Sequence, residues 1–362
     1  MLRSAIAMLM ILAACRKENT FIPEETEQLP PQAVTEIKGF YLLNEGNMGS
    51  NKASLDYYDF SSGTYRRNIY NQTNPEVTLG LGDVGNDVQI YGSRMYVVVN
   101  MSNKVEVLNA NTSKRIGQIQ IPNCRYITFH KNKAFVTAYD GYVSVIDTAS
   151  LTEQKKITVG KQPEEMAIVG EKLYVANSGG YNYPNYERSV SVIDLNTLTE
   201  TKKIDVAINL HRLKADQYGD LYVSSRGDYY NIPSNLYVID TKTDAVKKTF
   251  NIAASDIKIN KDKAYIYSVE YNYTTGGNTI SYSMINVKDE TLLKDSFITD
   301  GTKKAIVIPY GLAINPFNED VYVTDALDYA SPGVLYCFDK NGKKKFSVTT
   351  GDIPAHITFL TK

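Results

Sequence analysis

The segment KLYVAN (residues 172–177), followed after a loop by SVSVID (residues 189–194), decides the fold. In both pieces apolar residues alternate with polar ones or run together for a few positions, which is the pattern of a β-strand. The first piece recurs as RMYVVVN (94–100), KAFVTAY (133–139), DLYVSSR (220–226), KAYIYSV (263–269) and DVYVTDA (320–326), with FYLLNEG (40–46) as a weaker copy. The chain is therefore built from repeats of one β-rich unit.

The repeat has seven copies, and each copy carries an aromatic marker in its second strand. The markers are Tyr41, Tyr96, Phe135, Tyr174, Tyr222, Tyr265 and Tyr322. Successive markers lie as little as 39 residues apart, which is the length of a four-stranded propeller blade. One blade cannot bury both of its faces, but a ring of blades can. The sequence predicts an all-β fold, a seven-bladed β-propeller.

The two ends of the repeat predict how the ring closes. The last segment, IPAHITFL (353–360), resembles the first strand of other blades, for example QPEEMAIV (162–169), yet no further blade follows it. The first blade begins near Phe40 with its second strand. We expect the C-terminal strand to complete the N-terminal blade, which leaves no open edge in the ring.

Composition narrows the classes of function. Lys and Arg number 39 against 40 Asp and Glu, so no basic surplus favours nucleic acid as a partner. Cys15, Cys124 and Cys337 form no metal-ligand cluster, and the last two fall in different repeats, so we expect neither a zinc site nor a disulfide. With three His and no GxSxG, HExxH or phosphate-loop motif, we expect no enzyme, no metal and no intrinsic cofactor.

The N-terminus reads MLRSAIAMLMILAAC (1–15). Its apolar run is shorter than the ~20 residues of a membrane-spanning helix and is typical of a secretory signal. LAAC (12–15) resembles the bacterial lipobox; the alternative is an ordinary signal peptide with a chance Cys. We expect residues 1–14 to be a lipoprotein signal peptide, lipidation at Cys15, residues 15–38 to be a lipid-anchored flexible tether, and residues 39–362 to be the propeller.

Long loops are concentrated on one face of the predicted ring. Loops that follow the second and fourth strands of a blade open on the same face, and here they are long, whereas loops of the other face are as short as YGS (91–93). The long loops span residues 44–52, 71–85, 177–188, 226–235, 269–278, 299–309 and 325–333. Because binding residues usually sit on loops held by a rigid scaffold, we expect the ligand site on this face.

These loops combine Tyr with Asn, Gly and Ser, which is the composition of antibody-like binding loops. It suits a large, partly flat ligand that carries amides or hydroxyls. The predicted ligand-binding residues of the loops are Tyr181, Tyr183, Tyr186, Arg226, Tyr229, Tyr230, Tyr271, Tyr273, Asp325 and Tyr329. The alternative is that the tyrosines pack the loops against one another.

The inner strands add charged residues at the mouth of the central channel. Alignment of these strands places seven residues at one position near the loop-rich face: Asp87, Arg125, Glu165, Arg212, Asp256, Gly311 and His356. We expect Arg125, Arg212 and His356 to contact the ligand; the alternative is a set of ion pairs that closes the channel. The acidic members could imitate an axial metal site, but the two arginines would oppose a cation.

The repeat resembles the YVTN family of bacterial propellers (YncE-like), with YVAN (174–177) in place of the name-giving tetrapeptide. With the lipobox and the Tyr/Asn-rich loops, the chain is similar to surface lipoproteins of Bacteroidetes that capture vitamin B12, the BtuG family. This resemblance implies cobalamin or a related corrinoid as bound ligand, with no side chain on the cobalt.

The same resemblance implies a BtuB-like TonB-dependent β-barrel transporter of the outer membrane as partner. It places the protein on the outer membrane through its lipid anchor only and facing the cell surface; a periplasmic face is the alternative. Two other functions stay open from the residues: a glycan- or protein-binding adhesion propeller, and a metal-dependent lactonase-like hydrolase.

Overall fold

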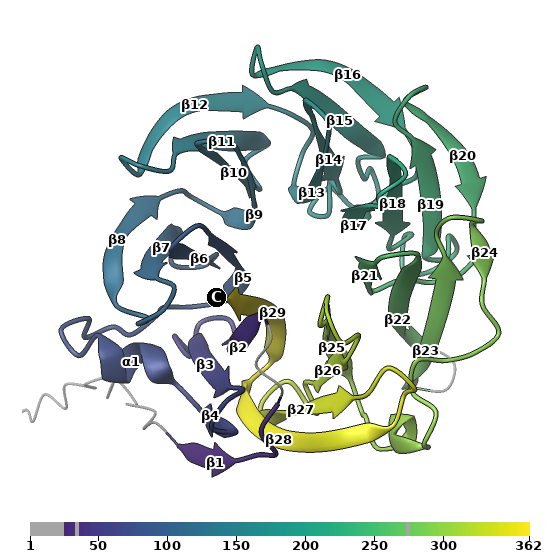
Figure 1. The fold of residues 1–362 in the computed structure, drawn as a ribbon. Coiled ribbons are helices and arrows are strands. Elements are labelled where there is room, and N and C mark those ends of the chain that lie inside the picture. The colour runs from purple at the N-terminus through teal and green to yellow at the C-terminus, as the bar shows by residue number, and fades with distance from the viewer. Residues whose placement is uncertain (1–24, 33–35, 273–275) are drawn as a thin grey trace, which may run out of the picture.

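The computed structural model describes residues 25–32, 36–272 and 276–362. Seven β-sheets are arranged as blades around a central axis (Figure 1). The predicted seven-bladed β-propeller is confirmed. No helix of the described residues is long and apolar enough to cross a membrane.

Blade 1 combines both ends of the chain. Its strands, in sheet order, are β1 (Thr26–Gln28), β4 (Thr64–Arg66), β3 (Ser54–Asp59), β2 (Ile37–Asn44) and β29 (Pro354–Thr361). β29 is the innermost strand and pairs antiparallel with β2, so that Phe359 lies opposite Phe40. The predicted closure of the ring by the C-terminal strand is confirmed (Figure 1).

The other six blades each hold four strands in chain order from the axis outward. Blade 2 contains β5 (Gly85–Tyr91), β6 (Arg94–Val99), β7 (Lys104–Asn109) and β8 (Arg115–Gln120). Blade 3 contains β9 (Cys124–His130), β10 (Lys133–Ala138), β11 (Tyr142–Asp147) and β12 (Thr152–Thr158). Blade 4 contains β13 (Pro163–Val169), β14 (Lys172–Asn177), β15 (Ser189–Asp194) and β16 (Thr199–Asp205).

Blade 5 contains β17 (Leu210–Ala215), β18 (Asp220–Ser225), β19 (Asn235–Asp240) and β20 (Ala245–Thr249). Blade 6 contains β21 (Asp256–Asn260), β22 (Lys263–Asn272), β23 (Gly277–Asn286) and β24 (Thr291–Leu292). Blade 7 contains β25 (Pro309–Ile314), β26 (Val321–Asp325), β27 (Pro332–Phe338) and β28 (Lys344–Asp352). Two short helices lie in links between blades: α1 (Ile69–Thr73) and the 3₁₀ helix η1 (Thr302–Lys304).

In the second strand of each blade, side chains alternate between the two neighbouring blades, and this alternation allows the blades to pack against one another. In β14, Leu173 and Val175 pack with side chains of blade 3, whereas Tyr174 and Ala176 pack with side chains of blade 5. Successive side chains of a strand point to opposite faces, so one strand serves both neighbouring interfaces.

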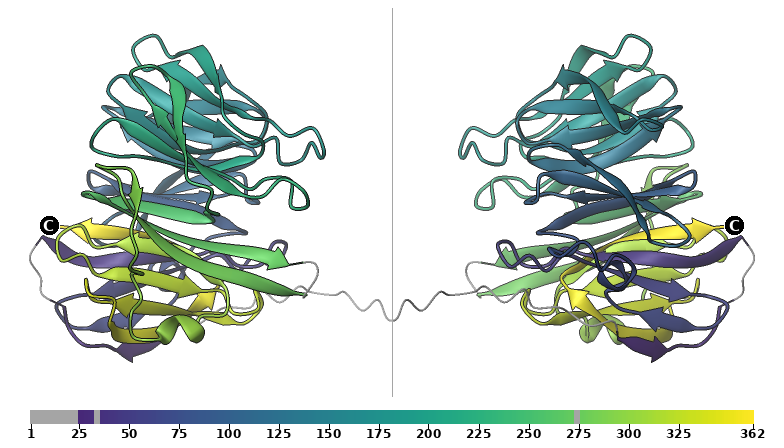
Figure 2. Two further views of the ribbon diagram at one scale, coloured as in Figure 1. Left: turned by 90° about the vertical axis from the view of Figure 1, so that its right-hand side faces the viewer. Right: turned by 90° about the vertical axis from the view of Figure 1, so that its left-hand side faces the viewer.

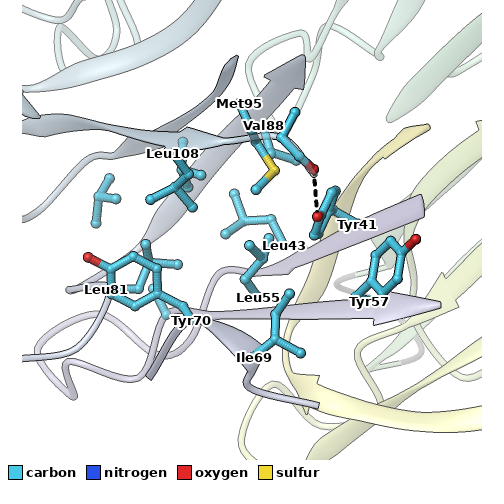
Figure 3. Close-up of a cluster of buried hydrophobic side chains, with 14 of the residues drawn as sticks. Tyr41, Leu43, Leu55, Tyr57, Ile69, Tyr70, Leu81, Val88, Met95 and Leu108 are labelled. Atoms are coloured by element: carbon cyan, nitrogen blue, oxygen red, sulfur yellow. Dashed lines mark hydrogen bonds between the residues drawn. The ribbon is translucent and has the colours of Figure 1, made fainter. Parts of the chain in front are cut away.

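The aromatic markers point toward the following blade. Tyr174 donates a hydrogen bond to Asp244 of blade 5 (3.0 Å). Tyr41 of blade 1 packs with Val88 and Met95 of blade 2, as Figure 3 shows. Its hydroxyl donates to the carbonyl of Ala110 (2.7 Å). The markers are therefore core residues of the blade interfaces.

Part of the segment predicted as a flexible tether, residues 15–38, belongs to the propeller instead. β1 pairs with β4 on the outer edge of blade 1, with Thr26 opposite Arg66 and Gln28 opposite Thr64. Leu29, which directly follows β1 in the chain, is buried. A polar stretch without alternation can still form an edge strand that faces water, so composition concealed this one. The predicted signal peptide, the predicted lipidation site Cys15 and the remainder of the predicted tether to residue 24, together with residues 33–35, lie outside the described residues.

Candidate functional site

A cavity of about 840 Å³ lies on the axis at the loop-rich face; we call it the Tyr cavity. Its floor comes from the beginnings of the inner strands, and its wall comes from the long loops of blades 5, 6 and 7. The side views in Figure 2 show the loops and the β22–β23 hairpin extending from one side of the ring, with the C-terminus on the other. A second cavity of about 390 Å³ is lined by the later residues of the inner strands, at the opposite end of the axis.

Four of the predicted tyrosines line the Tyr cavity: Tyr229, Tyr230, Tyr271 and Tyr329. Their exposed fractions are 52%, 66%, 55% and 41%, so these rings stand at the surface rather than in the core. Their arrangement provides a rim of aromatic faces with polar tips. Tyr273 lies outside the described residues.

Three further predicted tyrosines form a ridge beside the cavity, on the loop between β14 and β15. Tyr183 lies 6.2 Å from Tyr230 and 6.0 Å from Tyr186, measured between ring centroids. Tyr181 stands edge-on to Tyr139 at 5.2 Å. The ridge extends the aromatic surface from blade 5 to blade 4 without entering the cavity.

The segment predicted as a loop at 269–278 continues a hairpin instead. β22 and β23 pair as far as Asn272 opposite Gly277. Tyr267, Val269 and Tyr271 all line the cavity because alternate residues of a strand share a face. Sequence analysis did not select Tyr267; its spacing of two and four residues from Val269 and Tyr271 was the available signal.

The inner strands share one irregularity that aims polar side chains at the axis. In six of them the pairing with the second strand skips a residue at the same place, as in a β-bulge. Two successive residues there form two layers: Asn86–Asp87, Arg125–Tyr126, Glu164–Glu165, His211–Arg212, Tyr310–Gly311 and Ala355–His356. We call the first members the upper layer and the second members the lower layer.

The bulge corrects the predicted alignment. Arg125 was expected at the level of Asp87 and Arg212, but the residue at that level is Tyr126. The backbone N–H of Tyr126 donates to Thr137 (3.0 Å), just as that of Arg212 donates to Ser224 (3.0 Å). Arg125 therefore lies one residue closer to the loop-rich face. Alignment on the aliphatic residue that follows each pair would have given the correct register.

Upper-layer residues build an ion network under the cavity. Glu164 is fully buried between blades; its Oε2 accepts from Arg125 (3.2 Å) and its Oε1 from Arg226 (3.1 Å). Burial acts to raise the pKa of Glu164, but Arg125 and Arg226 together hold it below its ordinary value. Glu164 is therefore an anion that two arginines share. Sequence analysis missed Glu164.

Arg212 reaches the floor of the cavity from the lower layer. Its Nη1 donates to the Tyr126 hydroxyl (2.8 Å) and its Nε to the carbonyl of Ser255 (3.3 Å). His211, beside it, lies 3.4 Å from the same hydroxyl. Burial, and then the charges of Arg226, Arg212 and Arg125, lower the pKa of His211 well below its ordinary value, so this ring is neutral.

The lower-layer carboxylates join neighbouring blades. Asp87 accepts the backbone N–H of Ile127 in blade 3 (3.0 Å), and Glu165 accepts that of Leu213 in blade 5 (2.9 Å). Glu165 also pairs with Lys214. These contacts match the alternative in which ion pairs and hydrogen bonds close the channel. Among the described residues no group of three His, Cys, Asp or Glu is placed to hold a metal ion.

Two predicted site residues lie away from the Tyr cavity. His356 lines the cavity at the opposite end, and its Nε2 is 3.5 Å from Glu45. Asp325 is fully buried and accepts the backbone N–H groups of Val307 (2.9 Å) and Ile308 (2.8 Å). Its carboxylate thus holds in place the segment that leads into β25, the first strand of blade 7.

These features define a closed, seven-bladed β-propeller with a Tyr-rimmed axial cavity on its loop-rich face. Residues 38–359 match the family model described as "Domain of unknown function (DUF5074)", and the chain belongs to that family. Comparison with curated proteins gave no significant match.

Solved structures share the fold at low sequence identity. A quinonprotein alcohol dehydrogenase-like protein from Bacteroides thetaiotaomicron is 19% identical with a TM-score of 0.66, covering 89% of this chain and 78% of that one. Hydrazine synthase of Kuenenia stuttgartiensis is 15% identical with a TM-score of 0.62, covering 76% and 89%. The computationally designed Ika8 protein is 11% identical with a TM-score of 0.55, covering 91% and 92%. Identities this low establish the fold alone.

Proposed function

We propose that this chain is a lipid-anchored surface protein that captures cobalamin or a related corrinoid and passes it to an outer-membrane TonB-dependent β-barrel transporter. The observation that carries the proposal is the Tyr cavity. Its volume of about 840 Å³ suits a large ligand, and its rim presents exposed aromatic rings. Rigid aromatic rings give contact area at low cost in conformational entropy.

The chemistry of the wall supports a ligand with a flat body and amide arms. Tyr229, Tyr230 and Tyr271 provide flat surfaces, while Asn278, Thr279 and Ser234 provide polar groups on the same wall. Amide arms both donate and accept hydrogen bonds, as these side chains do. The ridge around Tyr183 adds aromatic surface on the side of blade 4.

Calorimetric titration of the full chain in mild detergent with cyanocobalamin tests the proposal. We expect one-to-one binding at micromolar concentration or tighter. Replacing Tyr229 and Tyr230 together by Ala should weaken binding by about tenfold or more, since truncated aromatic anchors at the centre of an interface cost most. Tyr218→Ala is the matched control, because Tyr218 is also exposed but lies on the opposite face in the β17–β18 turn.

Absence of heat and of retained colour with the wild-type chain would exclude corrinoid capture. A glycan-binding propeller is then the second candidate, favoured by the exposed ridge outside the cavity, where Tyr181 and Tyr183 are 79% and 63% exposed. In that case a glycan array should identify a ligand whose binding Tyr181→Ala reduces.

A further inference from the structure

Three arginines and a histidine meet at one place on the floor of the Tyr cavity. Arg125 comes from blade 3, while Arg212, Arg226 and His211 come from blade 5. The guanidinium groups of Arg125 and Arg212 lie 5.6 and 5.5 Å from the centre of the Tyr126 ring, and Arg125 shares the carboxylate of Glu164 with Arg226. Contacts with Tyr126 and Glu164 thus bring the three arginines together beneath the cavity.

Part of the donor capacity of these arginines is unused within the described chain. Arg226 donates from Nη1 to Glu164, and its Nε and Nη2 form no hydrogen bond with a described residue. Arg212 uses Nη1 and Nε, while its Nη2 has no such bond. Both side chains line the cavity, with Arg226 more exposed than the buried Arg212, so we expect these N–H groups to be reached by a ligand from the cavity.

The carboxylates that contact these arginines are shared between cations. Glu164 serves both Arg125 and Arg226. Asp256 lies 3.4 Å from Arg212 and also 3.6 Å from Lys258. Each of these two carboxylates thus serves two cations.

Two other carboxylates line the cavity. Glu45 accepts from the Tyr310 hydroxyl (2.8 Å) and faces His356, and Glu270 accepts from Ser234. Each has a partner of its own, and neither forms an ion pair with one of the three arginines among the described contacts.

We propose that Arg212 and Arg226, supported by Arg125, bind an oxyanion of the phosphate type at the floor of the Tyr cavity. A guanidinium group presents parallel N–H donors that match two oxygens of such an anion. The anion is either a free phosphate ion or the phosphodiester of a larger ligand, such as the nucleotide loop of cobalamin. In the second case the inference rests on the proposed function; in the first it is independent of it.

Titration of the full chain with inorganic phosphate tests the site without a corrinoid. We expect saturable binding at millimolar concentration or tighter, and binding about 10- to 100-fold weaker in Arg226→Gln, which loses one charge-assisted contact. Arg188→Gln is the matched control: it removes an equal charge from an exposed pair with Asp205 and should leave phosphate binding unchanged. Lack of saturable binding by the wild type overturns the inference.

A second variant changes binding in the opposite direction. Glu164→Gln removes the anion that competes for Arg226 and Arg125, so phosphate should bind several-fold more tightly. The unfolding midpoint of each variant shows whether it is folded. Unchanged or weaker phosphate binding by folded Glu164→Gln would also overturn the inference, even if Arg226→Gln does not fold.

A pair of corrinoids separates the two sources of the anion. Cobinamide lacks the nucleotide loop and its phosphate, so it should bind to the wild type more weakly than cobalamin does. The Arg226→Gln variant should bind cobinamide and cobalamin with equal affinity. If the wild type binds phosphate and also binds cobinamide and cobalamin with equal affinity, the site is assigned to a free oxyanion. Phosphate binding without any corrinoid binding rejects the proposed function alone, whereas corrinoid binding without phosphate binding rejects this inference alone.

Discussion

The upper and lower layers of the inner strands arise from the same bulge, yet their charged groups have different surroundings. In the lower layer, Glu165 is occupied by a backbone N–H of the next blade and by Lys214. In the upper layer, Glu164 is shared by Arg125 and by Arg226, which comes from the loop after β18 and lines the open cavity. A charged residue on the axis is therefore not by itself a ligand site: what matters is whether its hydrogen-bonding capacity is already used.

The largest expected effect is on stability and falls in the lower layer. Glu165→Ala removes the acceptor of the Leu213 N–H and leaves Lys214 unpaired, so we expect the free energy of unfolding to fall by about 3 kcal/mol. Urea unfolding followed by circular dichroism measures it. Glu165→Gln, which keeps an acceptor, should lose clearly less. If Glu165→Ala instead abolishes ligand binding at unchanged stability, the contrast between the layers is wrong.

A smaller effect concerns pH and His211. The folded-state pKa of His211 lies below its unfolded value of about 6.5, so its contribution to stability is complete above that pH and is lost as pH falls toward the folded value. We expect wild-type stability to fall by up to about 1.4 kcal/mol per pH unit below pH 6.5 from this residue. His211→Gln should flatten that slope when unfolding midpoints are compared from pH 7 to pH 5. An identical slope in the variant would contradict the assignment.

The smallest expected effect tests whether the lower layer supports the proposed anion site. Tyr126 and Arg212 both belong to the lower layer, and the Tyr126 hydroxyl accepts from Arg212 beneath the cavity. Tyr126→Phe removes that acceptor and should cost about 1 kcal/mol of stability. It should also change phosphate affinity by a few-fold, because Arg212 loses a positioning contact. A stability change without any change in phosphate binding would show that Arg212 is held by its other partners.

The sequence predicted the fold well because the fold depends on a repeated pattern. The alternation in KLYVAN and its copies sets which side chains face which blade, and this pattern needs no tertiary information. The pairing of β29 with β2 also followed from the order of repeats. β1 was not predicted, since an exposed edge strand has no apolar face and so lacks the alternation that marks the other strands.

The site was predicted only in part. The Tyr residues of the long loops were identified because loop length and composition are visible in the sequence, and four of them line the cavity. The register of Arg125 was wrong by one residue, because a bulge inserts a residue without altering composition. Glu164 became visible only through Arg125 and Arg226, its partners from other blades, whereas Tyr267 could have been selected from its spacing within its own strand.

The position of β1 determines where a mechanical load would enter the ring. Any pull on the chain ahead of residue 25 reaches β1 first, and β1 pairs with β4 at three positions, flanked by the backbone hydrogen bonds of Arg67 to Glu25 and of Leu29 to Gly63. The seam that closes the ring, β2 with β29, has seven paired positions and lies beyond β1 along the chain. β1 would therefore detach before force reached the seam, which protects the circular structure and the cavity while the chain is under tension.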